Sequence, residues 1–129
     1  MNGFFSGHHG HLKSSNCVVD FRWICKLTDY GLEALMAKSE VPYDDKMTEH
    51  RAKGLLWKAP EILRNTKNVD QKAADVYSFG IVLQEIMMQD VAFAVERESH
   101  SLEEIIDNVL HGTPAFRPKI PEGEVLYNH

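Results

Sequence analysis

Three side chains near the start of the chain have the chemistry to hold a metal-bound phosphate. Asn16 carries an amide oxygen, and Asp29, 13 positions later, carries a carboxylate. Between them two β-rich runs, 17–19 and 23–27, flank a polar turn, which predicts a tight hairpin with both oxygen groups at its open end. Hard cations such as Mg²⁺ take oxygen ligands, and in phosphoryl transfer Mg²⁺ bridges phosphate oxygens. The positive charge of Lys13 would then point at the terminal phosphate.

The segment that contains Lys13 and Asn16 has the spacing of a protein-kinase catalytic loop. Residues 9–16 read HGHLKSSN, against the pattern H-R-D-L-x-x-x-N. His11 stands where the pattern has the catalytic Asp, whose carboxylate accepts the substrate hydroxyl proton. A histidine, with an ordinary pKa of about 6.5, can act as a base, but it cannot supply a fixed negative charge beside Mg²⁺. We therefore expect His11 to be inactive and assign no catalytic residue.

Gly10 is the second departure from the catalytic-loop pattern. The pattern has Arg at this position. In many kinases that Arg clamps a phosphorylated activation loop through charge-assisted hydrogen bonds. Glycine cannot form such bonds, so we expect the clamp to be lost.

Three further motifs follow in the order that kinases use. They are Asp29-Tyr30-Gly31, then Ala59-Pro60-Glu61, then Asp75-Val76-Tyr77-Ser78-Phe79-Gly80. Each is weak alone, but with the loop they are specific as a set. The set resembles the lower lobe of a protein kinase, and its wording resembles the kinase-homology domain of receptor-type (particulate) guanylate cyclases, in particular the natriuretic-peptide-receptor type. The resemblance is carried by HGHLKSSNCVVD (9–20), KLTDYGLE (26–33), LLWKAPEIL (55–63) and ADVYSFGIVLQEI (74–86).

The resemblance implies a mainly α-helical fold with a short β-hairpin, that is, a partial protein-kinase-like C-terminal lobe with the N-terminal lobe absent. It divides the chain into an N-terminal remnant (1–8), the partial lobe (9–120) and a tail (121–129). It implies nucleotide or phosphate binding by Lys13, Asn16 and Asp29, the last two as Mg²⁺ ligands. The positions with a structural role are His9, Tyr30, Gly31, Ala59, Pro60, Glu61 and Asp75, and Asp75 is expected to anchor the catalytic-loop backbone.

In that family the kinase-like domain is treated as a pseudokinase. The resemblance therefore implies a regulatory segment that binds Mg-ATP in the complete domain and controls a C-terminal cyclase domain that makes cGMP from GTP. The implied partners are the missing N-terminal lobe, the downstream cyclase domain and a second copy in a homodimer. The implied location is the cytoplasmic side of the plasma membrane.

The same comparison shows which parts of a kinase are not found in the sequence. There is no Gly-rich loop and no V-A-I-K lysine, and ATP lies between two lobes in kinases. We therefore expect this chain to be inactive as an enzyme and to bind no cofactor tightly. Two alternatives remain: a fragment of an active ATP-dependent protein kinase, and a truncated chain without independent function.

The periodicity of apolar residues predicts the supporting helices. Asp75–Met88 is predicted as a helix that starts with a cap from Asp75 or Ser78 and is buried nearly all round, with Val76, Phe79, Leu83 and Ile86 on one apolar face. The Ser101–Glu104 capping box begins another helix, which Gly112 ends. Pro60–Arg64 is predicted as a short helix, and residues 32–56 as a long loop.

Composition excludes several other classes of protein. The chain has 129 residues, enough for one small domain, and a net charge of −5, which argues against nucleic-acid binding. No run of 18 apolar residues could span a membrane, so the chain alone is expected to be soluble. Cys17 and Cys25 are too few for a disulfide scaffold, and we expect both to be buried, reduced thiols of an intracellular protein.

Overall fold

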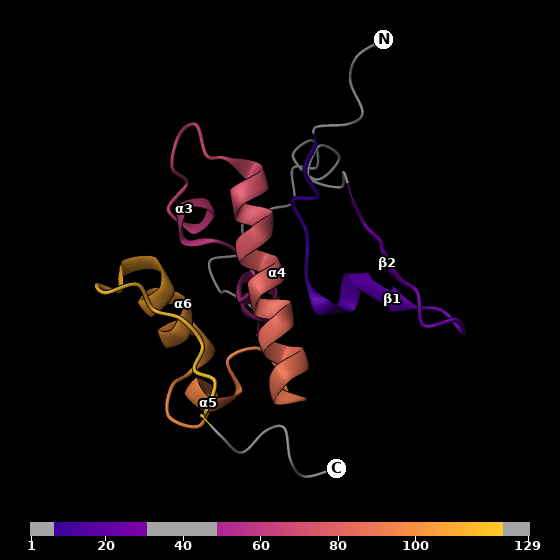
Figure 1. The fold of residues 1–129 in the computed structure, drawn as a ribbon. Helices are drawn as coiled ribbons and strands as arrows, with labels where there is room; N and C mark the ends of the chain where they lie inside the picture. Colours follow the sequence, from indigo (N-terminus) through magenta and orange to yellow (C-terminus); the bar gives the residue numbers. More distant parts are fainter. Residues whose placement is uncertain (1–6, 31–48, 123–129) are drawn as a thin grey trace.

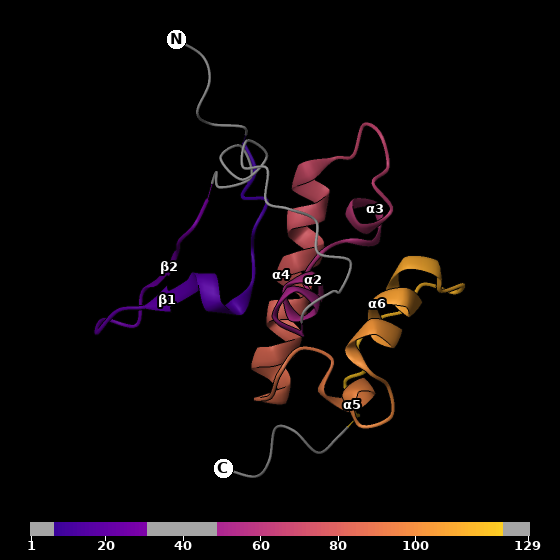
Figure 2. The same cartoon turned by 180° about the vertical axis from the view of Figure 1, so that it is seen from behind.

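The computed structural model describes residues 7–30 and 49–122. Helix α4 lies at the centre, with a β-hairpin on one side and helices α3, α5 and α6 on the other (Figure 1), and the view from behind, in which α2 overlaps α4, shows the same division (Figure 2). The predicted fold class, mainly α with a short hairpin, is confirmed. The elements in chain order are the 3-10 turn η1 (Ser14–Asn16), β1 (Cys17–Val19), β2 (Cys25–Leu27), α2 (Glu49–Leu55), α3 (Pro60–Leu63), α4 (Gln71–Met88), α5 (Ala94–Arg97) and α6 (Leu102–His111). The division into 1–8, 9–120 and 121–129 stays a prediction.

The hairpin forms where the two β-rich runs predicted it. Strands β1 and β2 pair antiparallel, with Cys17 opposite Leu27 and Val19 opposite Cys25. Asp20 closes the turn, because its carboxylate accepts hydrogen bonds from the backbone N–H groups of Arg22 (2.8 Å) and Ile24 (3.1 Å). A short polar side chain that bonds to the backbone ahead of it is a common way to hold a turn.

The start of α4 differs from the prediction. The helix begins at Gln71, four positions before Asp75, and its N-cap is Asp70, whose side chain accepts hydrogen bonds from the backbone N–H groups of Lys72 and Ala73. The expectation that Asp75 or Ser78 caps the helix is therefore wrong. The apolar pattern starts only after the first turn, so periodicity placed the boundary too late.

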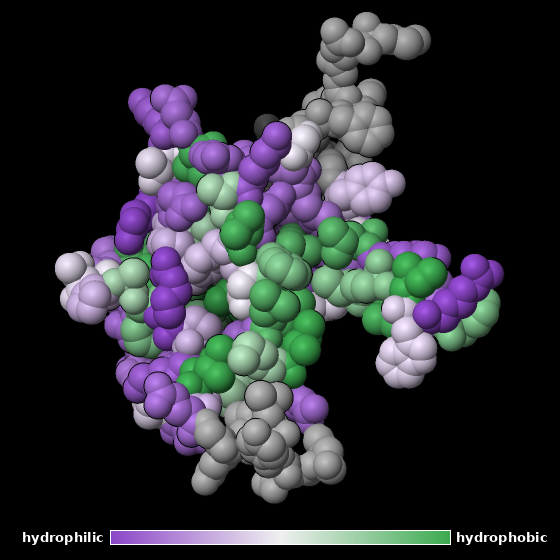
Figure 3. Space-filling view, viewed as in Figure 1, coloured by the Kyte–Doolittle hydropathy of each residue, from purple (hydrophilic) through white to green (hydrophobic). Residues whose placement is uncertain are grey.

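The buried face of α4 also differs from the prediction. Val76, Phe79, Leu83 and Ile86 were expected to be buried, but all four are exposed, Ile86 by 64 %. Burial falls instead on another face, where Ile81 is 3 % exposed. The reason is that the core lies on one side of α4 only, and the catalytic loop and hairpin on another side leave these four side chains exposed. Hydrophobic residues consequently gather along α4 and continue onto the hairpin at the surface (Figure 3).

The hydrophobic core lies between α4, α2 and α6. Its buried members are Ala52, Leu56, Ile81, Ala92, Phe93, Ile105, Ile106 and Val109. The helix α6 turns the last three of them inward at helical spacing, as predicted. Its predicted capping box is confirmed, because Ser101 Oγ accepts from the Glu104 N–H and the Glu104 carboxylate accepts from the Ser101 N–H.

Two short helices test the predictions of a long loop over 32–56 and of a short helix over Pro60–Arg64. The expectation of a loop over 32–56 is wrong for 49–55, which α2 occupies, and residues 32–48 lie outside the described residues. Its Ala52 is fully buried and a Lys53–Glu49 ion pair of 2.7 Å supports one turn, so tertiary packing stabilises a helix that periodicity missed. Helix α3 begins at Pro60 as predicted and ends at Leu63. Among the described residues, no helix is both long and apolar enough to cross a membrane.

Candidate functional site

The catalytic-loop segment is held to α4 by one carboxylate. Asp75 accepts hydrogen bonds from the backbone N–H groups of His9 (2.5 Å) and Gly10 (2.9 Å). Asp75 lies one turn inside the helix rather than at its start, so both carboxylate oxygens are available to the loop. This is the anchoring role expected for Asp75. It holds the start of the catalytic loop against α4.

The imidazole of His9 connects the loop to the end of the hairpin. Its Nε2 lies 2.7 Å from the Thr28 carbonyl oxygen, and its Nδ1 accepts a hydrogen bond from the His11 N–H at 3.1 Å. Because Nδ1 accepts, the proton must be on Nε2, which donates to Thr28. The ring also makes an edge contact with Tyr30, with 6.5 Å between the ring centres. His9 thus ties the segment before the base position to the Asp29-Tyr30 segment.

The backbone conformation at position 10 favours glycine. The φ of Gly10 is 78°, in the left-handed region that glycine adopts readily and other residues adopt at a cost of about 1–2 kcal/mol. The Gly10 carbonyl accepts a hydrogen bond from Lys58 Nζ at 2.6 Å. Gly10, Lys58, Ala59 and Asp75 are among the residues that line a cavity of only about 10 Å³. The loop and the Ala59-Pro60-Glu61 segment therefore pack closely, leaving room for about one water molecule.

Asn16 lies at the junction of the loop and the hairpin. Its side chain is only 4 % exposed, and its Nδ2 donates to the His11 carbonyl at 2.8 Å. That bond fixes the amide so that its oxygen faces the opposite way. Lys13 precedes the 3-10 turn, and its carbonyl accepts from the Asn16 N–H at 2.9 Å. The structure thus places Lys13 and Asn16 one tight turn apart.

Asp29 lies at the same end of the hairpin as Asn16. The Thr28 N–H donates to the Asn16 carbonyl at 2.8 Å, so Asp29 is the next residue after the last rung of the ladder. It is exposed and has a φ of 59°, a left-handed conformation that Asp tolerates better than most residues. The hairpin therefore brings together the two predicted Mg²⁺ ligands. Tyr30 is exposed, and Gly31 lies outside the described residues.

The Ala59-Pro60-Glu61 motif forms the start of α3. Ala59 lines the same small cavity as Gly10 of the catalytic loop. Ala59 is buried and is the N-cap of the helix, Pro60 is its first residue, and Glu61 is in its first turn. Proline suits this position because its missing N–H would be unpaired there in any case. An acidic residue in the first turn also faces the positive end of the helix dipole.

Sequence reasoning missed Glu85, which joins three segments. Its carboxylate accepts from Ser14 Oγ at 2.9 Å and from Trp57 Nε1 at 3.0 Å. It therefore links α4 to the catalytic loop and to the segment before α3. The stretch 74–86 contains Glu85, but nothing near it in the sequence shows its role, because its partners lie 71 and 28 positions away.

Burial raises the pKa of two described groups, the Cys17 thiol and the Tyr77 hydroxyl. Burial raises the pKa of the Cys17 thiol, and the charge and hydrogen bond of the neighbouring Cys25 thiol raise it further. Burial likewise raises the pKa of Tyr77, whose hydroxyl is buried without a hydrogen-bond partner. Cys17 is half-buried and Cys25 is exposed, so the expectation of two buried thiols is wrong for Cys25, which lies on a hairpin outside the core.

Comparison with known proteins agrees with this geometry. The family described as "Protein tyrosine and serine/threonine kinase" matches residues 6–124. The chain belongs to this family. Among its relatives are human atrial natriuretic peptide receptor 2, which is 45 % identical over 87 % of the chain, receptor-type guanylate cyclase gcy-28 of Caenorhabditis elegans, 43 % identical over 78 %, and bovine retinal guanylyl cyclase 2, 37 % identical over 88 %.

The chain is therefore a protein kinase-like segment that is homologous to natriuretic peptide receptor 2 and to receptor guanylate cyclases. It corresponds to 11 %, 8 % and 10 % of the length of these three relatives. Within this kinase-like segment, the described residues form a loop fixed at both ends, with an amide oxygen and a carboxylate at its hairpin end and His11 at the position of the base.

Proposed function

We propose that this chain is a regulatory segment of a receptor guanylate cyclase, which in the complete kinase-like domain binds Mg-ATP without transferring phosphate. The observation that carries the proposal is the loop between His9 and Asn16. Its backbone is held by Asp75 and its far end by the hairpin, while His11 replaces the carboxylate of the base. A loop kept in place without its base suits binding better than transfer.

The oxygen ligands at the hairpin end suit a hard divalent cation. Asn16 would contribute its amide oxygen, because its nitrogen is committed to the His11 carbonyl, and Asp29 would contribute its exposed carboxylate. Mg²⁺ is usually held by one or two such groups together with phosphate oxygens and water. When bound, the ion neutralises charge on the phosphates of the nucleotide. Lys13, three residues before Asn16 in the sequence, would add a positive charge.

The relatives suggest what the segment regulates. Two of the three are guanylate cyclases by name and one is a peptide receptor, and the chain corresponds to about a tenth of each. We place this segment on the cytoplasmic side of the plasma membrane, together with an N-terminal lobe, a downstream cyclase domain and a second copy in a homodimer. Nucleotide would act by favouring one state of that assembly over another.

A chimera tests the regulatory role. The matching segment of receptor-type guanylate cyclase gcy-28 is replaced by this chain, and cGMP formation is measured in membranes with and without ATP. We expect ATP to change the cyclase rate by about fivefold or more, and Asp29→Asn to reduce this response. Glu103→Gln, at an exposed position of α6, is the control and should leave the response unchanged. A chimera that makes cGMP but ignores ATP would contradict the proposal.

A transfer assay separates this function from that of an active kinase. The chain is joined to the upper lobe of a working kinase, and incorporation of labelled phosphate into protein is measured. We expect none from the chain as it is. His11→Asp tests whether the base is the missing element and should give measurable transfer. Transfer by the unchanged chain would instead favour the fragment of an active kinase.

The chain alone addresses the remaining alternative, that it has no function of its own. We expect Mg-ATP at millimolar concentration to leave its melting temperature unchanged. The Gly-rich loop and the V-A-I-K lysine, which in kinases hold ATP from the N-terminal lobe, are not found in this sequence. A ligand that binds only the folded state must raise that temperature. A clear rise with Mg-ATP would show that the chain binds nucleotide by itself.

A further inference from the structure

The two cysteines lie on one face of the hairpin. Cys17 pairs with Leu27 and Cys25 pairs with Val19, and side chains alternate between the two faces of a strand. All four side chains therefore point to the same side. Cys17 and Cys25 are diagonal neighbours on that side. Cys25 is two residues before Leu27, the partner of Cys17, and Cys17 is two residues before Val19, the partner of Cys25.

The hydrogen-bond pattern of the hairpin places both cysteines at non-hydrogen-bonded positions of the ladder. Asn16 with Thr28 and Asp20 with Ile24 are hydrogen-bonded pairs. Pairs alternate along an antiparallel ladder, so the pairs that contain Cys17 and Cys25 are of the non-hydrogen-bonded kind, in which facing residues are closest. The Cys25 thiol lies close enough to Cys17 to raise the pKa of the Cys17 thiol.

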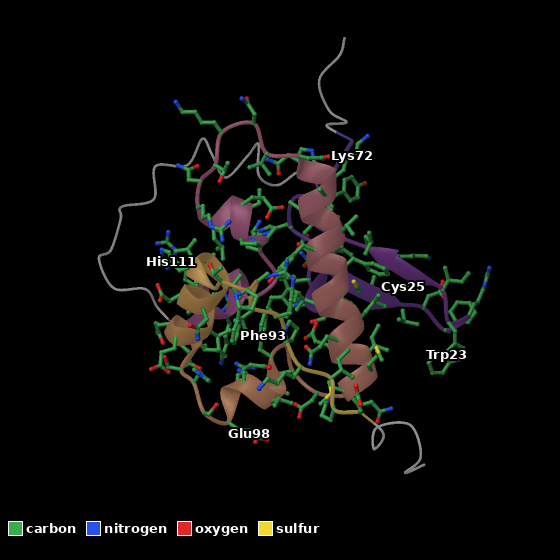
Figure 4. All side chains as sticks on the ribbon, turned by 60° about the vertical axis from the view of Figure 1, so that its left-hand side comes forward. Trp23, Cys25, Lys72, Phe93, Glu98 and His111 are labelled. Atoms are coloured by element: carbon green, nitrogen blue, oxygen red, sulfur yellow. The ribbon has the colours of Figure 1, made fainter. Side chains whose placement is uncertain are left out.

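The surroundings make Cys25 the accessible member of the pair. Cys25 is exposed and Cys17 is half-buried, where it also donates to the Lys13 carbonyl at 3.5 Å. Figure 4 shows Cys25 on the hairpin, on the far side of α4 from Phe93 and the core. A small oxidant can therefore reach Cys25 without unfolding of the core.

We propose that Cys17 and Cys25 form a redox-active pair, which a hydroperoxide converts into a disulfide across the hairpin. The Cys25 sulfur attacks the peroxide, the O–O bond breaks, and a sulfenic acid and one molecule of water or alcohol are formed. The Cys17 sulfur then attacks the Cys25 sulfur, and the S–O bond breaks with loss of a water molecule. Each thiol gives up one hydrogen, and the peroxide accepts the two electrons.

Closure of this bond would alter the end of the hairpin that bears the candidate ligands. Diagonal residues of a sheet are separated by about 7–8 Å, and a disulfide joins Cα atoms about 4.4–6.8 Å apart, so the hairpin must twist further to close it. Two-stranded ribbons twist more than larger sheets. Asn16 directly precedes Cys17, and Asp29 follows two residues after Leu27. A bond that tightens the ribbon therefore shifts both oxygen groups, and it would be readily reduced again in a reducing compartment.

The 129-residue chain with dilute hydrogen peroxide tests the proposal. We expect an intact mass lower by two hydrogen atoms, and a peptide map in which Cys17 is linked to Cys25. The same treatment in concentrated urea measures closure in the unfolded chain, where the two residues meet only by diffusion of an eight-residue loop. We expect closure to be about tenfold faster without urea, because the hairpin holds the thiols together.

Two single variants serve as matched controls. Cys17→Ser should leave Cys25 to be oxidised to sulfenic and sulfinic acids, and Cys25→Ser should leave the half-buried Cys17 mostly unreacted. The proposal is overturned if the unchanged chain gains oxygen at Cys25 or forms linked dimers instead of the internal bond. Equal closure rates with and without urea would also overturn it, since the hairpin would then contribute nothing. Formation of the disulfide does not depend on the nucleotide-binding function proposed above, whereas its effect on Asn16 and Asp29 rests on that function.

Discussion

The carboxylate of Asp75 accepts a hydrogen bond from the backbone N–H of His9, although the two residues are 66 positions apart. Asp75 also accepts from the next backbone N–H. Two oxygens of one side chain therefore hold two successive peptide groups of the loop. The contact makes the conformation of the catalytic-loop segment depend on the central helix, and not on the hairpin alone.

Asp75→Asn should loosen this attachment. An amide has one oxygen and an NH₂ group, so one loop N–H loses its acceptor and meets a donor instead. We expect the free energy of unfolding to fall by about 2 kcal/mol, measured by urea denaturation with an unchanged m-value. Asp70→Asn is the matched control, because Asn is as good an N-cap as Asp. Similar losses in both variants would contradict the anchoring role of Asp75.

The two isoleucines of α4 test which face of the helix is buried. Ile81 is 3 % exposed and Ile86 is 64 % exposed. Ile81→Ala should lower the free energy of unfolding by about 3 kcal/mol, since it leaves a cavity in the core. Ile86→Ala should change it by less than about 0.5 kcal/mol. The same denaturation measurement compares them, and equal losses would mean that the helix is covered on both sides.

These results show where sequence reasoning succeeds for this chain. The hairpin, the capping box of α6 and the start of α3 at Pro60 were all predicted correctly. Each depends on residues close together in the sequence: a polar turn between β-rich runs, a Ser and a Glu three apart, and a proline at a first helical turn. The anchoring by Asp75 was expected from a resemblance, and spacing alone would not have found it.

The errors fall where distant segments decide the outcome. Helix α4 has apolar residues on several sides, so its periodicity could not show that α6 and the segment around Phe93 would cover Ile81 and leave Ile86 exposed. Helix α2 was missed because burial of Ala52, not a sustained pattern, supports it. The role of Glu85 was not predicted, because its partners Ser14 and Trp57 are distant in the sequence and only the fold brings them to it.

The turn of the hairpin should depend on pH. Hydrogen bonds from the backbone of Ile24, then of Arg22, and a 3.2 Å ion pair with Lys26 lower the pKa of Asp20. A lowered folded-state pKa means that the stabilisation is present above the unfolded value, about 3.9 for Asp, and is lost as the pH falls through the folded value. The amide shifts of residues 22 and 24 should therefore move together below about pH 4. In Asp20→Asn, whose amide oxygen still accepts, they should not move.

Glu85 should control how Trp57 is held. Its carboxylate accepts from the Trp57 indole and from the Ser14 hydroxyl, so Glu85→Ala removes both acceptors from half-buried donors. We expect a loss of about 2 kcal/mol in the free energy of unfolding and a change in the emission of Trp57. The emission is read in a Trp23→Phe background, because Trp23 is 89 % exposed and contributes a second signal. Glu103→Ala, on the exposed side of α6, is the control. If Trp57 emission and stability stayed the same in Glu85→Ala, Glu85 would not be the link between α4, the loop and the segment before α3.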